Sequence, residues 1–204
     1  MKARKDTRQR LIDSACYLFY TRSYANVGVK EICDKAGVQK GSFYHFFPSK
    51  EKLTLAVLEE HFADFKDKII TKSFDPKLPP MQRIKRLMEN AYLFQVKVKE
   101  ETGQTLGCPY GNISAEMSTQ NEVIQKVTDS FFAKIEVGFE EILKEAVQNG
   151  DIEPIDTKKT AIAMLSYIEG MMLLARNRNN PEIIKQLSPA ILEIRIKPDA
   201  DFNT

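Results

Sequence analysis

The sequence is poor in the side chains that bind metals or cross-link small folds, with two histidines and three cysteines in 204 residues. The cysteines, Cys16, Cys33 and Cys108, are too few and too irregularly spaced for a disulfide framework or a four-ligand zinc site. Neither His45 nor His61 has a second metal ligand at helical spacing. We therefore expect free thiols, no metal and no cofactor.

Motifs of enzymatic catalysis are also missing. The chain contains no His-Glu-x-x-His, no Gly-x-Ser-x-Gly, no phosphate-binding loop and no dinucleotide fingerprint. Asp199 and Asp201 form a close pair of carboxylates, but they lie in a tail that we expect to fray. These absences predict that the protein has no catalytic residues. A helical enzyme is the alternative from this class.

Long apolar runs are absent as well. Segments such as Gly170–Ala175 fall far short of the length that crosses a bilayer. The first residues are charged and no apolar segment follows them, unlike a secretory signal. The expectation is a cytoplasmic protein with no membrane partner.

Charge is distributed unevenly along the chain. The net charge is only +2, but residues 1–50 contain ten basic and four acidic side chains, which gives +6 there and −4 in the rest. A basic end on an otherwise acidic protein is typical of a nucleic-acid-binding region. A solvated charged face is the alternative explanation.

Helical periodicity is nearly continuous and strand signals are nearly absent. Leu11, Ala15, Leu18 and Phe19 lie on one face of a helix expected from about residue 7 to 20. The same reasoning predicts helices at about 29–36, 39–46, 50–70, 84–100, 119–149, 157–176 and 181–196. The fold class is therefore all-α, with about nine helices.

Several residues predict where these helices begin and end. We expect caps at Ser49, at a Thr119–Glu122 capping box, at Gly150, at Asp156 and at Asn180-Pro181-Glu182, with Pro189 bending or restarting the last helix. Phe74–Pro80 has three prolines in five residues and predicts a hinge between domains. An irregular connector is expected from Thr102-Gly103 to Asn112. The predicted domains are 5–65 and 75–198.

The segment Val29–Phe47 has the pattern of a helix-turn-helix, in which Gly37 makes the turn between two short helices. The second helix would expose Gln39, Lys40, Ser42, Tyr44 and His45, which can reach base edges and phosphates in a major groove. Gly41 would let the backbone approach DNA closely. A helical hairpin without DNA-binding function is the alternative.

The stretch Ala36–Leu53 (AGVQKGSFYHFFPSKEKL) resembles the signature of the tetracycline-repressor (TetR) family of transcriptional regulators. The resemblance implies a dimer whose third helix enters the major groove of a palindrome-like operator. It assigns base or phosphate contacts to Lys40, Gly41 and Ser42, and backbone and groove-wall contacts to Tyr44 and His45. By the same resemblance, Lys50 would bind a phosphate together with the N-terminus of its helix, and Lys30 would bind another.

One position departs from that family pattern. Family members usually have Ser or Thr capping the second helix, whereas this chain has Val27-Gly28. A hydroxyl that both caps the helix and touches phosphate is missing, so Asn26 or the Gly28 backbone must substitute.

In the same family the C-terminal helices form an effector pocket, and the last two helices make a four-helix dimer bundle. Here these helices would be 157–176 and 181–196. The pocket candidates are Tyr92, Cys108, Tyr110, Met117, Phe131, Phe132, Met164 and Tyr167. An apolar pocket with a few polar groups is typical of small-molecule sites, although such residues also fill ordinary cores.

The segment Gly107–Glu116 resembles a Gly-Cys-x-x-Gly-Asn element found in some family members. A Cys108 thiolate near a helix N-terminus would react with oxidants or electrophiles. The main hypothesis is a ligand-released repressor that binds an inverted repeat as a homodimer. The alternatives are a redox-sensing or electrophile-sensing regulator acting through Cys108 and, from another class, a protein-binding adaptor.

Overall fold

The computed structural model describes residues 6–65, 70 and 73–198, and the regular secondary structure in this part of the chain is all helical. The helices are α1 (Thr7–Thr21), α2 (Val29–Ala36), α3 (Lys40–Phe46), α4 (Lys50–Phe65), α6 (Pro80–Thr102), α7 (Pro109–Met117), α8 (Glu122–Gln148), α9 (Thr157–Asn177) and α10 (Glu182–Leu187), followed by the 3₁₀ helix η2 (Ser188–Glu193). The all-α fold class is confirmed.

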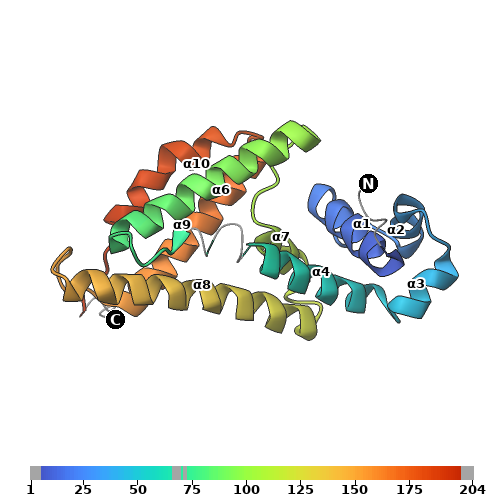
Figure 1. The fold of residues 1–204 in the computed structure, drawn as a ribbon, viewed down its shortest axis with the longest axis horizontal. Helices are drawn as coiled ribbons and strands as arrows, with labels where there is room; N and C mark the ends of the chain where they lie inside the picture. Colours follow the sequence, from blue (N-terminus) through green and yellow to red (C-terminus); the bar gives the residue numbers. More distant parts are fainter. Residues whose placement is uncertain (1–5, 66–69, 71–72, 199–204) are drawn as a thin grey trace. The chain divides into compact units, whose positions relative to one another are not determined.

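The chain divides into two compact units. Within the described residues, the first unit comprises 6–64 and 109–129, and the second comprises 65–108 and 130–198. Helix α7 and the start of α8 therefore belong with the N-terminal helices, although the sequence suggested a simple division near residues 65–75. Helix α8 runs through both units (Figure 1).

The first unit is built on a small core shared by α1, α2, α3 and the start of α4. Leu11, Ile32, Phe43 and Leu53 are fully buried and come from these four helices in turn. In Figure 1 α1, α2 and α3 lie close together, and each of them contacts the other two. Burial of one large apolar side chain contributes about 1.5–3 kcal/mol, so the core fixes α3 against its neighbours.

The turn between α2 and α3 follows the expected glycine. Gly37 has φ +63°, a left-handed conformation that costs glycine little, and it ends α2. The Val38 amide donates to the Cys33 carbonyl at 3.0 Å, and the Arg10 guanidinium of α1 donates to the Ala36 carbonyl at 3.1 Å. These bonds hold the two short helices at a fixed angle, as a helix-turn-helix requires.

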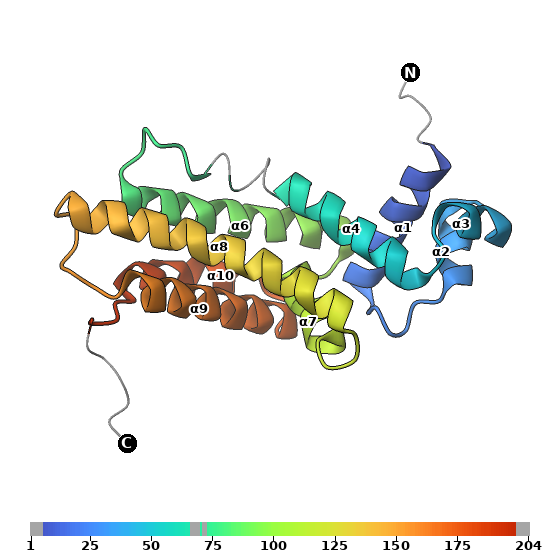
Figure 2. The same cartoon turned by 90° about the horizontal axis from the view of Figure 1, so that it is seen from below.

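The second unit is a bundle of α6, α9, α10 and η2, together with most of α8. Helix α6 packs against α10 and η2, and α10 also packs against α9 (Figures 1 and 2). Its buried residues recur on one face of each helix, for example Ile84, Leu87 and Met88 on α6 and Ala161, Met164 and Leu165 on α9.

The buried arginine Arg83 holds the loop that enters α6. Its Nε donates to the carbonyls of Asp75 (3.1 Å) and Leu78 (2.8 Å), and its Nη2 donates to that of Pro76 (2.9 Å). Two further bonds, of 2.6 and 2.9 Å, join the guanidinium to both carboxylate oxygens of Glu145 on α8. The proline-rich segment predicted as a hinge is therefore fixed to α6 and α8.

A buried amide holds the connector between α6 and α7. The Gln95 side chain donates to the Gly107 carbonyl at 2.8 Å and accepts from the amides of Leu106 (3.2 Å) and Gly107 (3.1 Å). Gly107 has φ +70°, and a Cβ there would lie 3.1 Å from the Met172 carbonyl oxygen of α9. Only glycine fits this position without strain.

Most predicted helix ends agree with the structure. The side chains of Ser49 and Asp156 accept backbone hydrogen bonds from Lys52 (3.1 Å) and Lys159 (2.9 Å). Gly150 follows α8 with φ +76°, as a C′ glycine does. Asn180 accepts from the Glu182 amide at 3.1 Å, at the start of α10.

Other expectations about helix ends were wrong. Asn121, not Thr119, caps α8, because the Asn121 side chain accepts from the Ile124 amide at 2.9 Å. The last helix, expected at 181–196, ends at Leu187 and restarts as η2 up to Glu193, so its expected end was wrong while the prediction that Pro189 bends or restarts it is confirmed. Part of the expected connector is helix α7, with Pro109 at the first position that proline favours. The end of the expected helix 50–70 lies outside the described residues.

Candidate nucleic-acid interface

The α3 segment exposes nearly all the side chains that the sequence assigned to DNA. Gln39, Lys40, Gly41, Tyr44 and His45 are exposed, and Ser42 is half-buried. Between them Phe43 is fully buried and anchors the helix to the core. The helix therefore presents a polar and aromatic face whose position is fixed by packing, which is what base recognition in a groove requires.

Gly41 is not required by the fold. A Cβ at this position would meet nothing within 4 Å, and the residue has no left-handed backbone. Internal packing therefore gives no reason for a glycine inside a short helix, where glycine costs about 1 kcal/mol relative to alanine. A close approach by something outside the protein would supply that reason.

Lys30 lies on α2 with its side chain 88% exposed. Its ammonium is 3.8 Å from the Asp34 carboxylate, one helical turn further on. An exposed pair of this kind contributes little to stability. Lys30 is therefore available for a phosphate, as the sequence suggested.

Lys50 is arranged differently from the sequence-based expectation. Its ammonium donates to the Tyr24 carbonyl and lies 3.9 Å from the centre of the Tyr24 ring. Partial burial lowers the pKa of Lys50, while the negative charge of Glu116 on α7 acts to raise it. The ammonium thus has partners within the first unit, and a phosphate would have to join or replace them.

The start of α2 has no side-chain cap. Gly28 is its N-cap residue, and no side chain accepts a hydrogen bond from the first turn. Asn26 does not substitute, because no side chain caps α2; its backbone N–H donates to Ser23 Oγ at 3.2 Å. The first turn of α2 therefore begins without a capping side chain.

The eight pocket candidates do not form one group. Tyr92, Cys108, Phe131, Phe132, Met164 and Tyr167 belong to the second unit, whereas Tyr110 and Met117 belong to the first. Three tyrosine hydroxyls already donate within the protein: Tyr92 to Glu182, Tyr110 to the Leu58 carbonyl and Tyr167 to the Leu187 carbonyl. Each candidate's contact with an effector stays a prediction.

The second unit has a groove of about 590 Å³ between α6 and the α10–η2 segment. It is lined by Lys85, Met88, Glu89, Tyr92, Leu93, Lys185, Ser188, Pro189 and Leu192. Among the pocket candidates only Tyr92 lies on it. Its volume is in the range of small-molecule sites.

Cys108 is half-buried, and its thiol hydrogen bonds to the carboxylate of Glu169 on α9. Burial raises the pKa of Glu169, and the bond from Cys108 acts in the opposite direction. A negative carboxylate does not favour a thiolate beside it, because like charges repel. Redox or electrophile sensing by Cys108 stays a prediction that this arrangement does not favour.

Helix α9 has an exposed apolar stripe. Ile162, Gly170, Leu173 and Leu174 lie on its outer face, and Leu173 is 63% exposed. Leu187, at the end of α10, is also exposed. Large apolar side chains that stay in water on neighbouring helices are typical of a surface that another protein covers.

A buried core that fixes a short exposed helix after a glycine turn defines a DNA-binding protein of the helix-turn-helix class. Residues 11–57 match the family "Bacterial regulatory proteins, tetR family". Residues 80–189 match "Transcriptional regulator LmrA/YxaF-like, C-terminal domain". The chain belongs to the TetR family of transcriptional regulators.

Individual relatives agree with this assignment. The chain is 28% identical to the transcriptional repressor DhaR of Mycobacterium sp. (strain GP1) over 94% of its own length and 93% of DhaR. It is 30% identical to the repressor NemR of Escherichia coli (strain K12) over 71% of its length and 69% of NemR. The crystal structure of a regulatory protein TetR from Rhodobacter sphaeroides superposes with a TM-score of 0.82 at 24% identity, covering 93% and 99% of the two chains.

None of the helices in the described part of the chain is long and apolar enough to span a membrane.

Proposed function

We propose that this regulator is a repressor that binds an inverted-repeat operator as a homodimer in the cytoplasm and is released by a small-molecule effector. The observation that supports it most is the exposed face of α3, held in place by the buried Phe43. The repressors DhaR and NemR, which match most of this chain, support the direction of regulation.

In this proposal α3 enters the major groove. Lys40, Gly41 and Ser42 contact bases or phosphates at its first turn, with Gln39 just before it, and Tyr44 and His45 pack against the sugar-phosphate backbone. Lys30 and Lys50 supply phosphate contacts, which position the protein without reading sequence. Lys50 would donate to a phosphate while keeping its hydrogen bond to the Tyr24 carbonyl, since an ammonium has three N–H donors.

The exposed stripe of α9, with Leu187 of α10, is the surface that we assign to the dimer. Burying its leucines against a second copy would contribute about 25 cal/mol for each Å² of apolar surface removed from water. Two-fold symmetry then matches the two α3 helices to half-sites about 34–36 Å apart, or a multiple of that distance.

The effector site is assigned to the C-terminal domain expected at residues 75–198, with the eight pocket candidates above as residues to test. Release from DNA requires that the effector bind better to the form whose α3 helices are wrongly spaced. By reciprocity, an effector that weakens operator affinity tenfold must itself bind tenfold more weakly when operator is present.

The proposal is tested by salt titrations of operator binding. The variant Lys40→Ala should weaken operator binding and Lys30→Ala should lower the salt slope by about one, since each phosphate contact releases about one counterion. The control Lys158→Ala removes an exposed lysine of α9 and should change neither quantity. Operator affinity within twofold of wild type for Lys40→Ala, Tyr44→Ala and Lys30→Ala would show that the assigned surface is wrong.

A further inference from the structure

A single peptide group ahead of α2 is held from both sides by charged side chains. The carbonyl oxygen of the Tyr24–Ala25 peptide accepts from the ammonium of Lys50 on α4. The N–H of the same peptide, on Ala25, donates to Glu116 Oε2 on α7 at 3.1 Å. All four residues belong to the first unit.

Both contacts are charge-assisted, because one partner in each is ionised, and the contact of Glu116 is weakened by its exposure to solvent. The positive charge lies at the oxygen and the negative charge at the N–H, so each polarises the peptide in the direction that strengthens the other bond. The Tyr24 carbonyl also accepts from the Val27 amide at 3.4 Å, which closes the turn. The orientation of this turn is therefore fixed by α4 and α7 together.

The turn leads directly to Gly28, the first cap position of α2. Gly28 makes no side-chain cap, and Asn26 beside it is exposed. The start of α2 is therefore not fixed by the capping bond that usually does this work. The Tyr24–Ala25 peptide, held by Lys50 and Glu116, lies four residues before α2 begins and fixes the segment that leads into this helix.

We infer that Glu116 is a positioning residue for DNA binding, acting through the Tyr24–Ala25 peptide on the helix-turn-helix. It contacts no DNA in this assignment, which rests on the proposed role of the α3 surface. Loss of its carboxylate frees the turn and loosens the uncapped start of α2, although Ile32 and Phe43 keep α2 and α3 packed on the core, and it lowers affinity for the operator. Affinity for unrelated DNA, which needs charge rather than exact placement, changes less.

The experiment compares Glu116→Ala with Glu116→Gln. Both variants remove the charge, but the glutamine oxygen can still accept from the Ala25 amide, so their difference isolates the hydrogen bond. We expect Glu116→Ala to bind operator at least fivefold more weakly than Glu116→Gln, with a similar salt slope. A matched control, Glu141→Ala, removes an exposed glutamate of α8 and should leave operator affinity within twofold of wild type.

The amide resonance of Ala25 provides the readout that a general loss of stability would not move. In ¹H–¹⁵N spectra of the folded protein it should shift upfield in Glu116→Ala and move much less in Glu116→Gln. The inference would be overturned if the two variants bound operator with equal affinity, or if the Ala25 amide had the same chemical shift in both variants as in the wild type. If Lys40→Ala weakens operator binding while Glu116→Ala does not, α3 is still the DNA-binding surface, but Glu116 is not a positioning residue for it.

Discussion

Removing the guanidinium of Arg83 is expected to destabilise the second unit severely. Arg83→Met keeps most of the aliphatic stem but deletes five hydrogen bonds, three to loop carbonyls and two to Glu145. The carboxylate left behind, Glu145, is 41% exposed, so its unpaired charge costs little, and we expect a loss of about 2–3 kcal/mol that comes mainly from the loop carbonyls. Carbonyls left without donors add to the cost where water cannot reach them.

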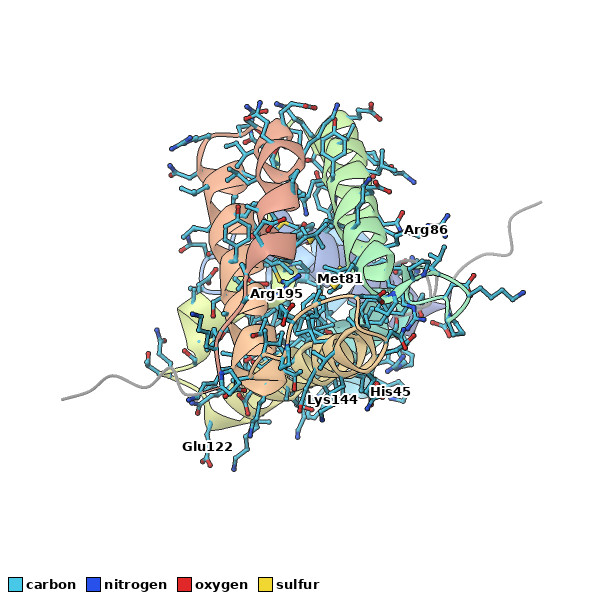
Figure 3. The ribbon with its side chains drawn as sticks, turned by 90° about the vertical axis from the view of Figure 1, so that its left-hand side faces the viewer. His45, Met81, Arg86, Glu122, Lys144 and Arg195 are labelled. Atoms are coloured by element: carbon cyan, nitrogen blue, oxygen red, sulfur yellow. The ribbon has the colours of Figure 1, made fainter. Side chains whose placement is uncertain are left out.

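The matched control is Arg86→Met in the same helix. Arg86 is exposed, and Figure 3 shows its side chain on the outer side of α6, projecting away from the bundle. We expect its replacement to change stability by less than about 0.5 kcal/mol.

Chemical and thermal unfolding, followed by circular dichroism, measure the difference between the two variants. At one fixed protomer concentration, the midpoint of thermal unfolding of Arg83→Met should lie on the order of 10 °C below that of the wild type. A loss below about 1 kcal/mol would show that the loop carbonyls and Glu145 find water at little cost, and the reasoning would fail.

Three further substitutions test local features. Gly28→Ser should stabilise the protein by about 0.5–1 kcal/mol in thermal unfolding, because its Cβ meets nothing within 4 Å and its hydroxyl can cap α2. Gly107→Ala should cost about 1 kcal/mol more than Gly103→Ala, since both have positive φ but only Gly107 approaches a carbonyl of α9; equal losses would argue against that contact. Glu145→Gln should make the free energy of unfolding depend less on pH in the acid range. Hydrogen bonding from Arg83 lowers the pKa of Glu145 in the folded protein. The stabilisation that this carboxylate contributes is therefore complete above the ordinary glutamate pKa of 4.5 and is lost as the pH falls below it. Parallel acid unfolding curves for wild type and Glu145→Gln would contradict this.

The helices could be predicted because their signals are local. Apolar periodicity places Leu11 and Phe19 on one face, and capping chemistry identifies Asp156 and Gly150, all within a few residues of the structure they determine. The exposed face of α3 follows from the same pattern. A closer reading of Pro109 would also have predicted the start of α7.

The remaining features depend on contacts between distant residues. Glu116 and Ala25 are 91 positions apart, and Arg83 and Glu145 are 62 apart, so no periodicity or motif connects them. Lys50 has the sequence position of a phosphate contact, but only the packed structure shows its ammonium against the Tyr24 carbonyl. Pairing between residues far apart in the sequence therefore could not be predicted before the fold was known.

The hydrogen bonds of Gln95 to the connector between α6 and α7 determine which mutations that connector tolerates. Three hydrogen bonds of its side chain go to main-chain atoms of Leu106 and Gly107, and these three do not depend on which side chains the two residues carry. Within this connector Gln104 is exposed and should be replaced freely, whereas Thr105 and Leu106 are buried and Gly103 has a positive φ. An inserted or deleted residue would bring the wrong peptide to the buried amide, so we expect the number of residues from Gln95 to Gly107 to be fixed even where a side chain, such as that of Gln104, is not.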